Sequence, residues 1–251
     1  MMDRVLDILG RTVFLPLLVA QGLQVRRKAL ILPEAAGARS GITGTGRDLH
    51  LLVLGDSSAA GVGVVTQDHA LTGQLVRRLS PQFRLHWRLD ALTGATTRST
   101  LARLRQTPPV RADAVVLALG VNDTTGAVTL GGWLSRQRRL LNLLRRDYGA
   151  RRIYVSAVPP IGQFPLLPHP LRWFLGRHAL RLDRGLQELL DRQPDCTHIA
   201  LDLPPDATLM AEDGFHPGAA VYDAWAECLA EHIRRDFLAA THGQSHLTAG
   251  H

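Results

Sequence analysis

Short apolar runs alternate with amphipathic stretches from His50 onward, a pattern typical of alternating strands and helices. The apolar runs predict five strands, at residues 50–54, 84–89, 114–119, 153–158 and 199–203. Amphipathic spacing predicts helices near residues 68–79, 97–106, 131–148, 172–193 and 218–236. Strand and helix repeats of this length indicate right-handed βαβ crossovers. We therefore expect one doubly wound α/β domain over residues 48–238, with a five-stranded parallel sheet.

The first 47 residues depart from this pattern. Apolar residues there recur at helical spacing, at Val5, Leu6, Leu9, Val13 and Leu17. A basic cluster follows at Arg26, Arg27 and Lys28. The Gly-rich run over residues 37–46 is expected to form a tether. The uncharged stretch before Arg26 has 14 residues and contains Pro16, whereas a bilayer span needs about 20 apolar residues. No small-residue cleavage site of a secretory signal is present.

These features predict a cytoplasmic protein with neither a cleavable signal peptide nor a transmembrane span. Two interpretations of residues 2–28 stay open: an interfacial anchor in peripheral contact with a membrane, or a helix packed on the domain or on a partner subunit. The polar tail 239–251 is expected to be flexible, and its three histidines are interpreted as part of that tail and not as a metal site.

Composition removes several classes of function. The formal charge of +7 could suggest a nucleic-acid partner, but 28 of the 29 basic residues are Arg, which is typical of a GC-rich genome. Arginine pairs also fall in the last turns of predicted helices, where cations complement the helix dipole, so we expect no nucleic-acid binding. The lone Lys28 follows no phosphate-binding glycine loop, which excludes P-loop chemistry. Cys196 and Cys228 lack metal or disulfide spacing, and Cys228 is expected to be a buried reduced thiol.

Polar residues follow the ends of the predicted strands, the edge where parallel sheets bind ligands. The first predicted strand is followed by Gly55-Asp56-Ser57-Ser58, and the second is soon followed by Gly94. The third is followed by Gly120-Val121-Asn122-Asp123, and the fifth by Asp213 and His216. Taken singly, each residue has a structural explanation, such as a helix cap or a turn. Together they form the inventory for acyl transfer through a covalent serine intermediate.

Each of these residues then has an expected role. Ser57 is the candidate nucleophile, on a tight strand-to-helix turn, and His216 is the candidate general base. Asp213, three residues before His216, can orient the imidazole. The backbone N–H groups of Ser57 and Gly94 and the side-chain amide of Asn122 are the candidate oxyanion donors. A metallophosphoesterase would require histidines beside Asp56 and Asn122, where this sequence has Ser57 and Asp123.

Three ordered blocks of this sequence resemble those of the SGNH (GDSL-type) serine hydrolases. The blocks are Gly55-Asp56-Ser57, Gly120-Val121-Asn122-Asp123 and Asp213-Gly214-Phe215-His216-Pro217. Gly94 falls where the second block of that family has its glycine. The resemblance covers roughly residues 48–238. It implies a flavodoxin-like three-layer α/β/α sandwich and a site of Ser57, Gly94, Asn122 and His216, with Asp213 completing the triad. It also implies that the enzyme needs neither a metal nor an organic cofactor.

Members of that family include esterases, lysophospholipases, thioesterases and carbohydrate deacetylases, so the resemblance leaves the substrate open. The proline-rich, apolar segment 159–175 follows the fourth strand and is interpreted either as a greasy wall of the site or as a packed crossover loop. On the first interpretation we expect Val121, Ile161, Phe164 and Phe215 to bind substrate, a small-molecule ester with a short or medium acyl chain. The alternatives are a carbohydrate O-deacetylase, a lysophospholipase or thioesterase, and a catalytically inactive protein that uses the fold for binding.

Overall fold

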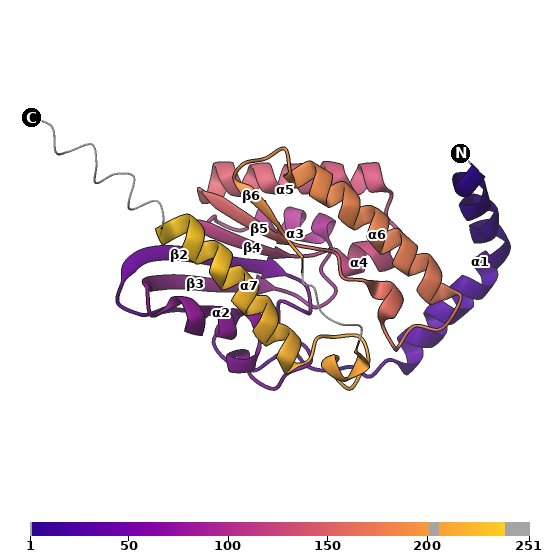
Figure 1. The fold of residues 1–251 in the computed structure, drawn as a ribbon, viewed down its shortest axis with the longest axis horizontal. Helices are drawn as coiled ribbons and strands as arrows, with labels where there is room; N and C mark the ends of the chain where they lie inside the picture. The colour runs from indigo at the N-terminus through magenta and orange to yellow at the C-terminus, as the bar shows by residue number, and fades with distance from the viewer. Residues whose placement is uncertain (1, 201–205, 239–251) are drawn as a thin grey trace, which may run out of the picture.

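The computed structural model describes residues 2–200 and 206–238, and for residues 2–13 and 207 it describes the backbone alone. At its centre lies a six-stranded sheet in the order β1-β3-β2-β4-β5-β6 (Figure 1). The strands are β1 (Ser40–Thr43), β2 (Arg47–Gly55), β3 (Phe83–Ala91), β4 (Ala114–Ala118), β5 (Arg152–Ser156) and β6 (Cys196–Ile199). Strands β2 to β6 pair in parallel, and β1 pairs antiparallel with β3 at one edge.

Helices cover both faces of the sheet. The helices of the described residues are α1 (Met2–Lys28), α2 (Leu71–Leu79), α3 (Thr97–Leu104), α4 (Val121–Thr125), α5 (Leu130–Tyr148), α6 (Leu171–Leu190) and α7 (Ala219–Leu238), with short 3-10 helices η1 (Gln67–His69), η2 (Ile161–Gln163) and η3 (Ala207–Leu209). Of these, α1 packs on α6 and not on the sheet. One hydrophobic core joins α3, α5 and α6 to the sheet, and the other joins α2 and α7 to its opposite face. The expected flavodoxin-like three-layer sandwich is therefore confirmed.

The central strand shows why its sequence is a continuous apolar run. All five residues of β4 are buried. Val115 and Leu117 belong to the core under α5, whereas Ala114, Val116 and Ala118 belong to the core under α7. A strand that is covered on both faces cannot alternate apolar with polar residues. Each strand end is thereby held rigidly, which gives the loops beyond it a fixed base.

Three elements differ from the sequence prediction. Residues 40–43, expected to lie in a tether, form the edge strand β1, and residues 121–125 form the unpredicted short helix α4. Strand β6 covers residues 196–199, and not 199–203 as predicted, and residues 201–203 lie outside the described part of the chain. The histidines of the tail 239–251 also lie outside it.

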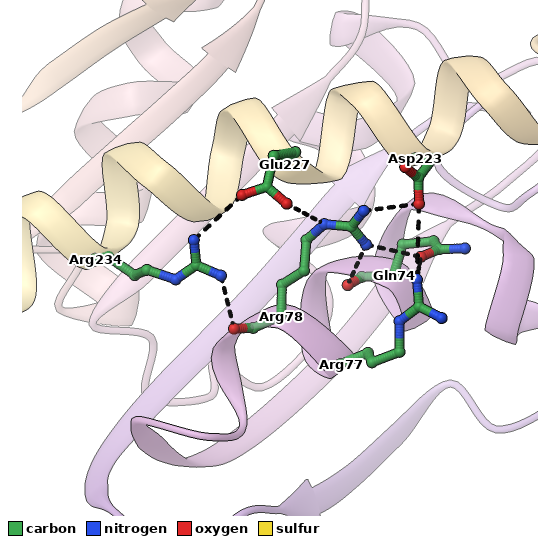
Figure 2. Close-up of polar contacts among 6 residues, drawn as sticks. All are labelled: Gln74, Arg77, Arg78, Asp223, Glu227 and Arg234. Carbon is green, nitrogen blue, oxygen red and sulfur yellow. Dashed lines mark hydrogen bonds and ion pairs between the residues drawn. The ribbon is translucent and has the colours of Figure 1, made fainter.

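Arginines join α2 to α7 on the outside of the sandwich (Figure 2). The guanidinium of Arg78 donates hydrogen bonds to Glu227 and Asp223, each at 2.7 Å. Arg234 donates to the same Glu227 at 3.3 Å and to the backbone carbonyl of Arg78 at 2.9 Å. Arg78 thus lies in the last turn of α2, as predicted, and also forms ion pairs between helices.

The two cysteines form no disulfide. Cys228 is half-buried against the core under α7, and burial raises the pKa of its thiol. None of the helices in the described residues is both long enough and apolar enough to cross a bilayer.

Candidate active site

Ser57 lies on a sharp turn directly after β2. A Cβ atom on Gly55 would come within 2.4 Å of the Ala59 Cβ and 2.7 Å of the Ala118 carbonyl oxygen, so only glycine fits there. The Asp56 N–H donates to that same carbonyl at 3.1 Å, which ties the turn to β4. The chain continues as turns over residues 57–63, and the helix predicted near residues 68–79 follows as η1 and α2. Ser57 is 8 % exposed, so its hydroxyl lies at the edge of the protein interior.

His216 and Asp213 share a short loop before α7. One carboxylate oxygen of Asp213 accepts the backbone N–H groups of Phe215 and His216, each at 2.9 Å, and the other accepts from the His216 Nδ1 at 2.5 Å. Burial raises the pKa of the Asp213 carboxyl, but these hydrogen bonds together hold it below its usual value. The bond from the His216 ring contributes most to this lowering. Asp213 therefore stays a carboxylate and fixes the imidazole ring through Nδ1.

The other imidazole nitrogen meets the serine. The His216 Nε2 lies 2.8 Å from the Ser57 Oγ, a normal hydrogen-bond length. The two loops are close-packed, because a Cβ on Gly63 would lie 2.3 Å from the Pro217 carbonyl oxygen. Tyr222 adds a further tie by donating to the Val62 carbonyl at 2.7 Å. Ser57, His216 and Asp213, predicted separately from the sequence, are thus brought into one continuous chain of hydrogen bonds.

Gly94 and Asn122 lie on the neighbouring strand ends. Gly94 has a φ of +79°, a left-handed conformation that favours glycine, in the exposed turn after β3. Asn122, at the start of α4, donates from Nδ2 to the Ala95 carbonyl at 3.0 Å. Its Nδ2 also lies 3.5 Å from an Asp56 carboxylate oxygen, at the limit of a hydrogen bond. Within the described residues, neither the Ser57 N–H nor the Gly94 N–H donates to another protein group.

Asp56 is a buried acid to which the sequence analysis gave no role. It is 2 % exposed, and its second carboxylate oxygen accepts from the N–H and the hydroxyl of Ser58, at 3.0 and 2.7 Å. Burial raises its pKa to about 6, although the bonds from Ser58 act in the opposite direction. Asp56 thereby links the serine turn to Asn122.

Asp123 is a second such acid, which the sequence could also explain as a turn residue. It accepts from the backbone N–H and the hydroxyl of Thr97, at 2.9 and 2.8 Å, and joins α4 to the start of α3. Trp133 and Gln137 of α5 donate to the same Thr97 hydroxyl. Burial raises the pKa of Asp123, with the Thr97 bonds opposing. The only sequence signal for either acid was a carboxylate next to small or apolar residues at a strand end.

The expected substrate wall is built differently from the prediction. Phe215 is partly exposed and packs edge-on against Phe164, with ring centroids 5.3 Å apart, and against His216. Phe164 itself is largely buried, and Val121 packs partly on the core. Ile161 is completely buried, so it is a core residue and has no surface with which to touch a substrate. The segment 159–175 is mainly a packed crossover, because Leu167, Leu171 and Phe174 also face the core or are buried.

No group of three or more His, Cys, Asp or Glu side chains in the described residues is placed to hold a metal ion. The arrangement at the strand ends offers a hydroxyl, a base held by a carboxylate, and N–H donors from the ends of three neighbouring strands, β3, β2 and β4.

Comparisons with known proteins agree with this geometry. Residues 53–224 match the family model of the GDSL-like lipase/acylhydrolases. A GDSL-like esterase of Mycobacterium tuberculosis is 29% identical over 197 residues, which is 72% of this chain. This chain's match spans 60% of the length of that relative.

Solved structures share the fold at lower identity. A psychrotrophic esterase from Pseudoalteromonas has a TM-score of 0.59 and 18% identity, over 76% of this chain and 100% of that one. An aryl esterase of M. smegmatis has a TM-score of 0.55 and 20% identity, over 74% of this chain and 98% of that one. The family model covers well over half of the sequence, from the end of β2 into α7, and includes every residue of the site described above. The resemblance seen in the three sequence blocks is confirmed, and the chain belongs to the GDSL-like lipase/acylhydrolase family.

Proposed function

We propose that the protein hydrolyses carboxylic esters through an acyl-enzyme intermediate on Ser57. The observation that carries this proposal is the unbroken contact from Asp213 through His216 to the Ser57 Oγ, at 2.5 and 2.8 Å. A serine hydroxyl is a weak nucleophile until a base at hydrogen-bond distance accepts its proton. Here the base has its other nitrogen held by a carboxylate, which selects the tautomer that can accept from the serine.

In the first half of the proposed reaction, the Ser57 Oγ attacks the ester carbonyl carbon while the His216 Nε2 takes the hydroxyl proton. The C=O electron pair moves to oxygen, and the resulting oxyanion accepts hydrogen bonds from the N–H groups of Ser57 and Gly94 and from the Asn122 amide. The C–O bond to the alcohol then breaks, and His216 gives its proton to the departing oxygen. Ser57 is left as an acyl ester.

In the second half, His216 takes a proton from a water molecule, whose oxygen attacks the acyl carbon. The same donors stabilise the second oxyanion. Breakage of the bond to the Ser57 Oγ, with return of the proton from His216, releases the carboxylic acid and restores the hydroxyl. Apart from the ester and the water molecule, every group in these two halves belongs to the chain itself.

For the substrate we propose esters with short or medium acyl chains. Phe215 supports this choice, because its partly exposed ring lies directly against His216 and offers an apolar surface beside the reacting bond. Phe164 packs against the same ring in an edge-to-face arrangement. An apolar wall favours alkyl groups over the hydroxyl-rich face of a sugar. A panel of p-nitrophenyl acyl esters of increasing length, with acetylated sugars beside it, measures the preference; faster turnover of the acetylated sugars would favour an O-deacetylase.

The first test of the proposal is the Ser57→Ala variant with p-nitrophenyl acetate. We expect turnover to fall by about four orders of magnitude or more, with the fold unchanged by circular dichroism. Ser80→Ala is the matched control, because Ser80 lies at the end of α2 and its hydroxyl donates to the local Arg77 carbonyl, away from the candidate site. Full activity in the Ser57 variant would overturn the proposal. Lack of esterase activity in the unmodified chain on every ester of the panel would support an inactive binding protein instead.

A further inference from the structure

Helix α1 is held against the start of α6 by one of its faces. The Gln21 side chain donates to the His169 carbonyl at 2.7 Å and accepts from the Leu171 N–H at 3.1 Å. Leu18 and Val25 pack against the core on the same side. These positions recur at three- or four-residue spacing, so they fix which face of α1 points inward.

Away from that contact, α1 leaves large apolar side chains in water. Leu15, Val19 and Leu23 recur every four residues and so share one stripe of the helix, and each is between 50% and 56% exposed. On the adjoining α6, Trp173 and Leu180 are 46% and 51% exposed. Figure 1 shows α1 at the same end of the molecule as the beginning of α6. An apolar surface gathered on two neighbouring helices indicates a binding partner.

Cations border this apolar surface on both helices. Arg26, Arg27 and Lys28 are exposed in the last turn of α1. On α6 the exposed residues Arg177, Arg181 and Arg184 follow Trp173 at helical spacing, and the Arg177 guanidinium lies 4.9 Å from the centre of the Trp173 ring. The three α6 arginines, with Leu180, line a groove of about 430 Å³ that Glu188 also borders. We call these exposed side chains of α1 and α6 the docking face.

We propose that the docking face binds the surface of a phospholipid bilayer that carries anionic lipid. Leucines and a tryptophan beside arginines match the layered chemistry of such a surface, where acyl chains lie under phosphate groups. A second copy of the chain fits less well, because a two-fold interface would place like charges of the two docking faces against each other. A bilayer neutralises those charges.

The docking face is connected to the candidate active site by a short packed segment. Residues 164–171 run from Phe164, which packs on Phe215, to Leu171, which is bound by Gln21. Within that segment the Leu166 N–H donates to the Gly214 carbonyl at 3.3 Å. A docked molecule would therefore hold the loop of His216 close to the lipid surface. Binding itself does not depend on the proposed ester hydrolysis, and the two can fail separately.

Co-sedimentation with vesicles tests the proposal on the full chain. The lipids are phosphatidylcholine alone and phosphatidylcholine mixed with phosphatidylglycerol. We expect binding to the mixed vesicles only, weakened but not abolished by added salt, because the apolar contribution remains. A deletion up to Gly46 is unsuitable, because it would remove the edge strand β1. Surface substitutions are therefore used.

Two variants remove the two parts of the docking face. The triple substitution Leu15→Ser, Val19→Ser and Leu23→Ser, and the double substitution Arg177→Glu and Arg184→Glu, should each lower the bound fraction about ten-fold or more at equal lipid. The matched controls are Val65→Ser, which removes an apolar side chain that is 83% exposed elsewhere, and Arg98→Glu, which reverses an exposed charge on α3. All variants should keep the fold and the hydrolysis of soluble p-nitrophenyl acetate.

Three outcomes would overturn the proposal. The first is unmodified protein that stays in the supernatant with the mixed vesicles. The second is equal sedimentation of the controls and the docking-face variants. The third is a dimer in sedimentation velocity that the triple substitution on α1 dissociates, without vesicle binding, which would assign the docking face to a second copy of the chain.

Discussion

At the scale of single residues, the candidate site depends on side chains that are held by their own partners. The Asn122 amide is fixed by the Ala95 carbonyl at 3.0 Å and has a second N–H proton that is only weakly engaged by Asp56. If that proton stabilises the oxyanion, Asn122→Ala should lower kcat by about 10²–10³ and leave KM nearly unchanged. Steady-state kinetics on p-nitrophenyl acetate measures this. A loss confined to KM would make Asn122 a residue that binds the ground state.

Asp56 gives a prediction about pH. Burial raises its pKa in the folded protein to about 6, from the ordinary value of 3.8 for a carboxyl of aspartate. Below a pH of 3.8 the carboxyl of Asp56 is protonated in both the folded and the unfolded chain. As pH rises, the unfolded chain loses its proton first, so the stabilisation that Asp56 gives at low pH is lost as pH passes through 6.

The Asp56→Asn variant lacks this titration. We expect the unfolding free energy of the unmodified protein, relative to the variant, to fall by about 2 kcal/mol between about pH 4 and pH 7. Urea denaturation at several pH values measures the difference. The variant also replaces a carboxylate, which accepts from both Asn122 and Ser58, by an amide with only one accepting oxygen. We therefore expect kcat to fall about ten-fold or more. A relative stability that does not change with pH would show that Asp56 is ionised throughout this range.

At the scale of elements, the arginines between α2 and α7 make unequal contributions. Arg78 has a side chain only 13% exposed and binds Glu227 and Asp223 at 2.7 Å, whereas Arg77 is 68% exposed and lies 3.7 Å from Asp223 (Figure 2). Exposed ion pairs contribute little, and partly buried ones more. We expect Arg78→Ala to lower the unfolding free energy by about 1–2 kcal/mol and Arg77→Ala by about 0.5 kcal/mol or less. Equal losses in urea denaturation would contradict this assignment.

Elements with strong hydrophobic patterns were predictable from the sequence, and short or polar ones were not. The apolar run over residues 114–119 and the amphipathic stretch over residues 131–148 correspond closely to β4 and α5. Strand β1 was missed because its four exposed residues, Ser-Gly-Ile-Thr, have no buried face and depend on pairing with β3. Helix α4 has only five residues, too few for a periodic pattern, and it is anchored by the buried contact of Asp123 with Thr97.

The site was predictable where chemistry demands particular residues at strand ends. Ser57, Asp213 and His216 were found because parallel strands bring their carboxyl ends to one edge. Ile161 was misassigned because a proline-rich loop has no periodicity that separates inward from outward side chains. Asp56 and Asp123 went unassigned because their roles depend on contacts between loops distant in the sequence, which no local pattern records.

At the scale of the whole molecule, the positive charge is distributed over both structural and exposed arginines. Arg78, Arg145 and Arg152 each bind a carboxylate across elements and join the layers of the sandwich. The arginines of the docking face are exposed, and Arg177 lies against the exposed Trp173. The candidate active site thus lies on an edge fixed by two close-packed loops, and the docking face that we propose lies on α1 and α6.

The central claim, a nucleophilic Ser57 activated by His216, is tested most directly by covalent labelling. An alkyl p-nitrophenyl phosphonate reacts when the Ser57 Oγ attacks phosphorus, p-nitrophenolate leaves and His216 takes the serine proton. We predict one p-nitrophenolate released per chain and a phosphonate mapped by peptide mass spectrometry to Ser57. Labelling should be absent in Ser57→Ala and slowed by several orders of magnitude in His216→Ala. A phosphonate on another residue, or equally fast labelling of the Ser57 variant, would contradict the account.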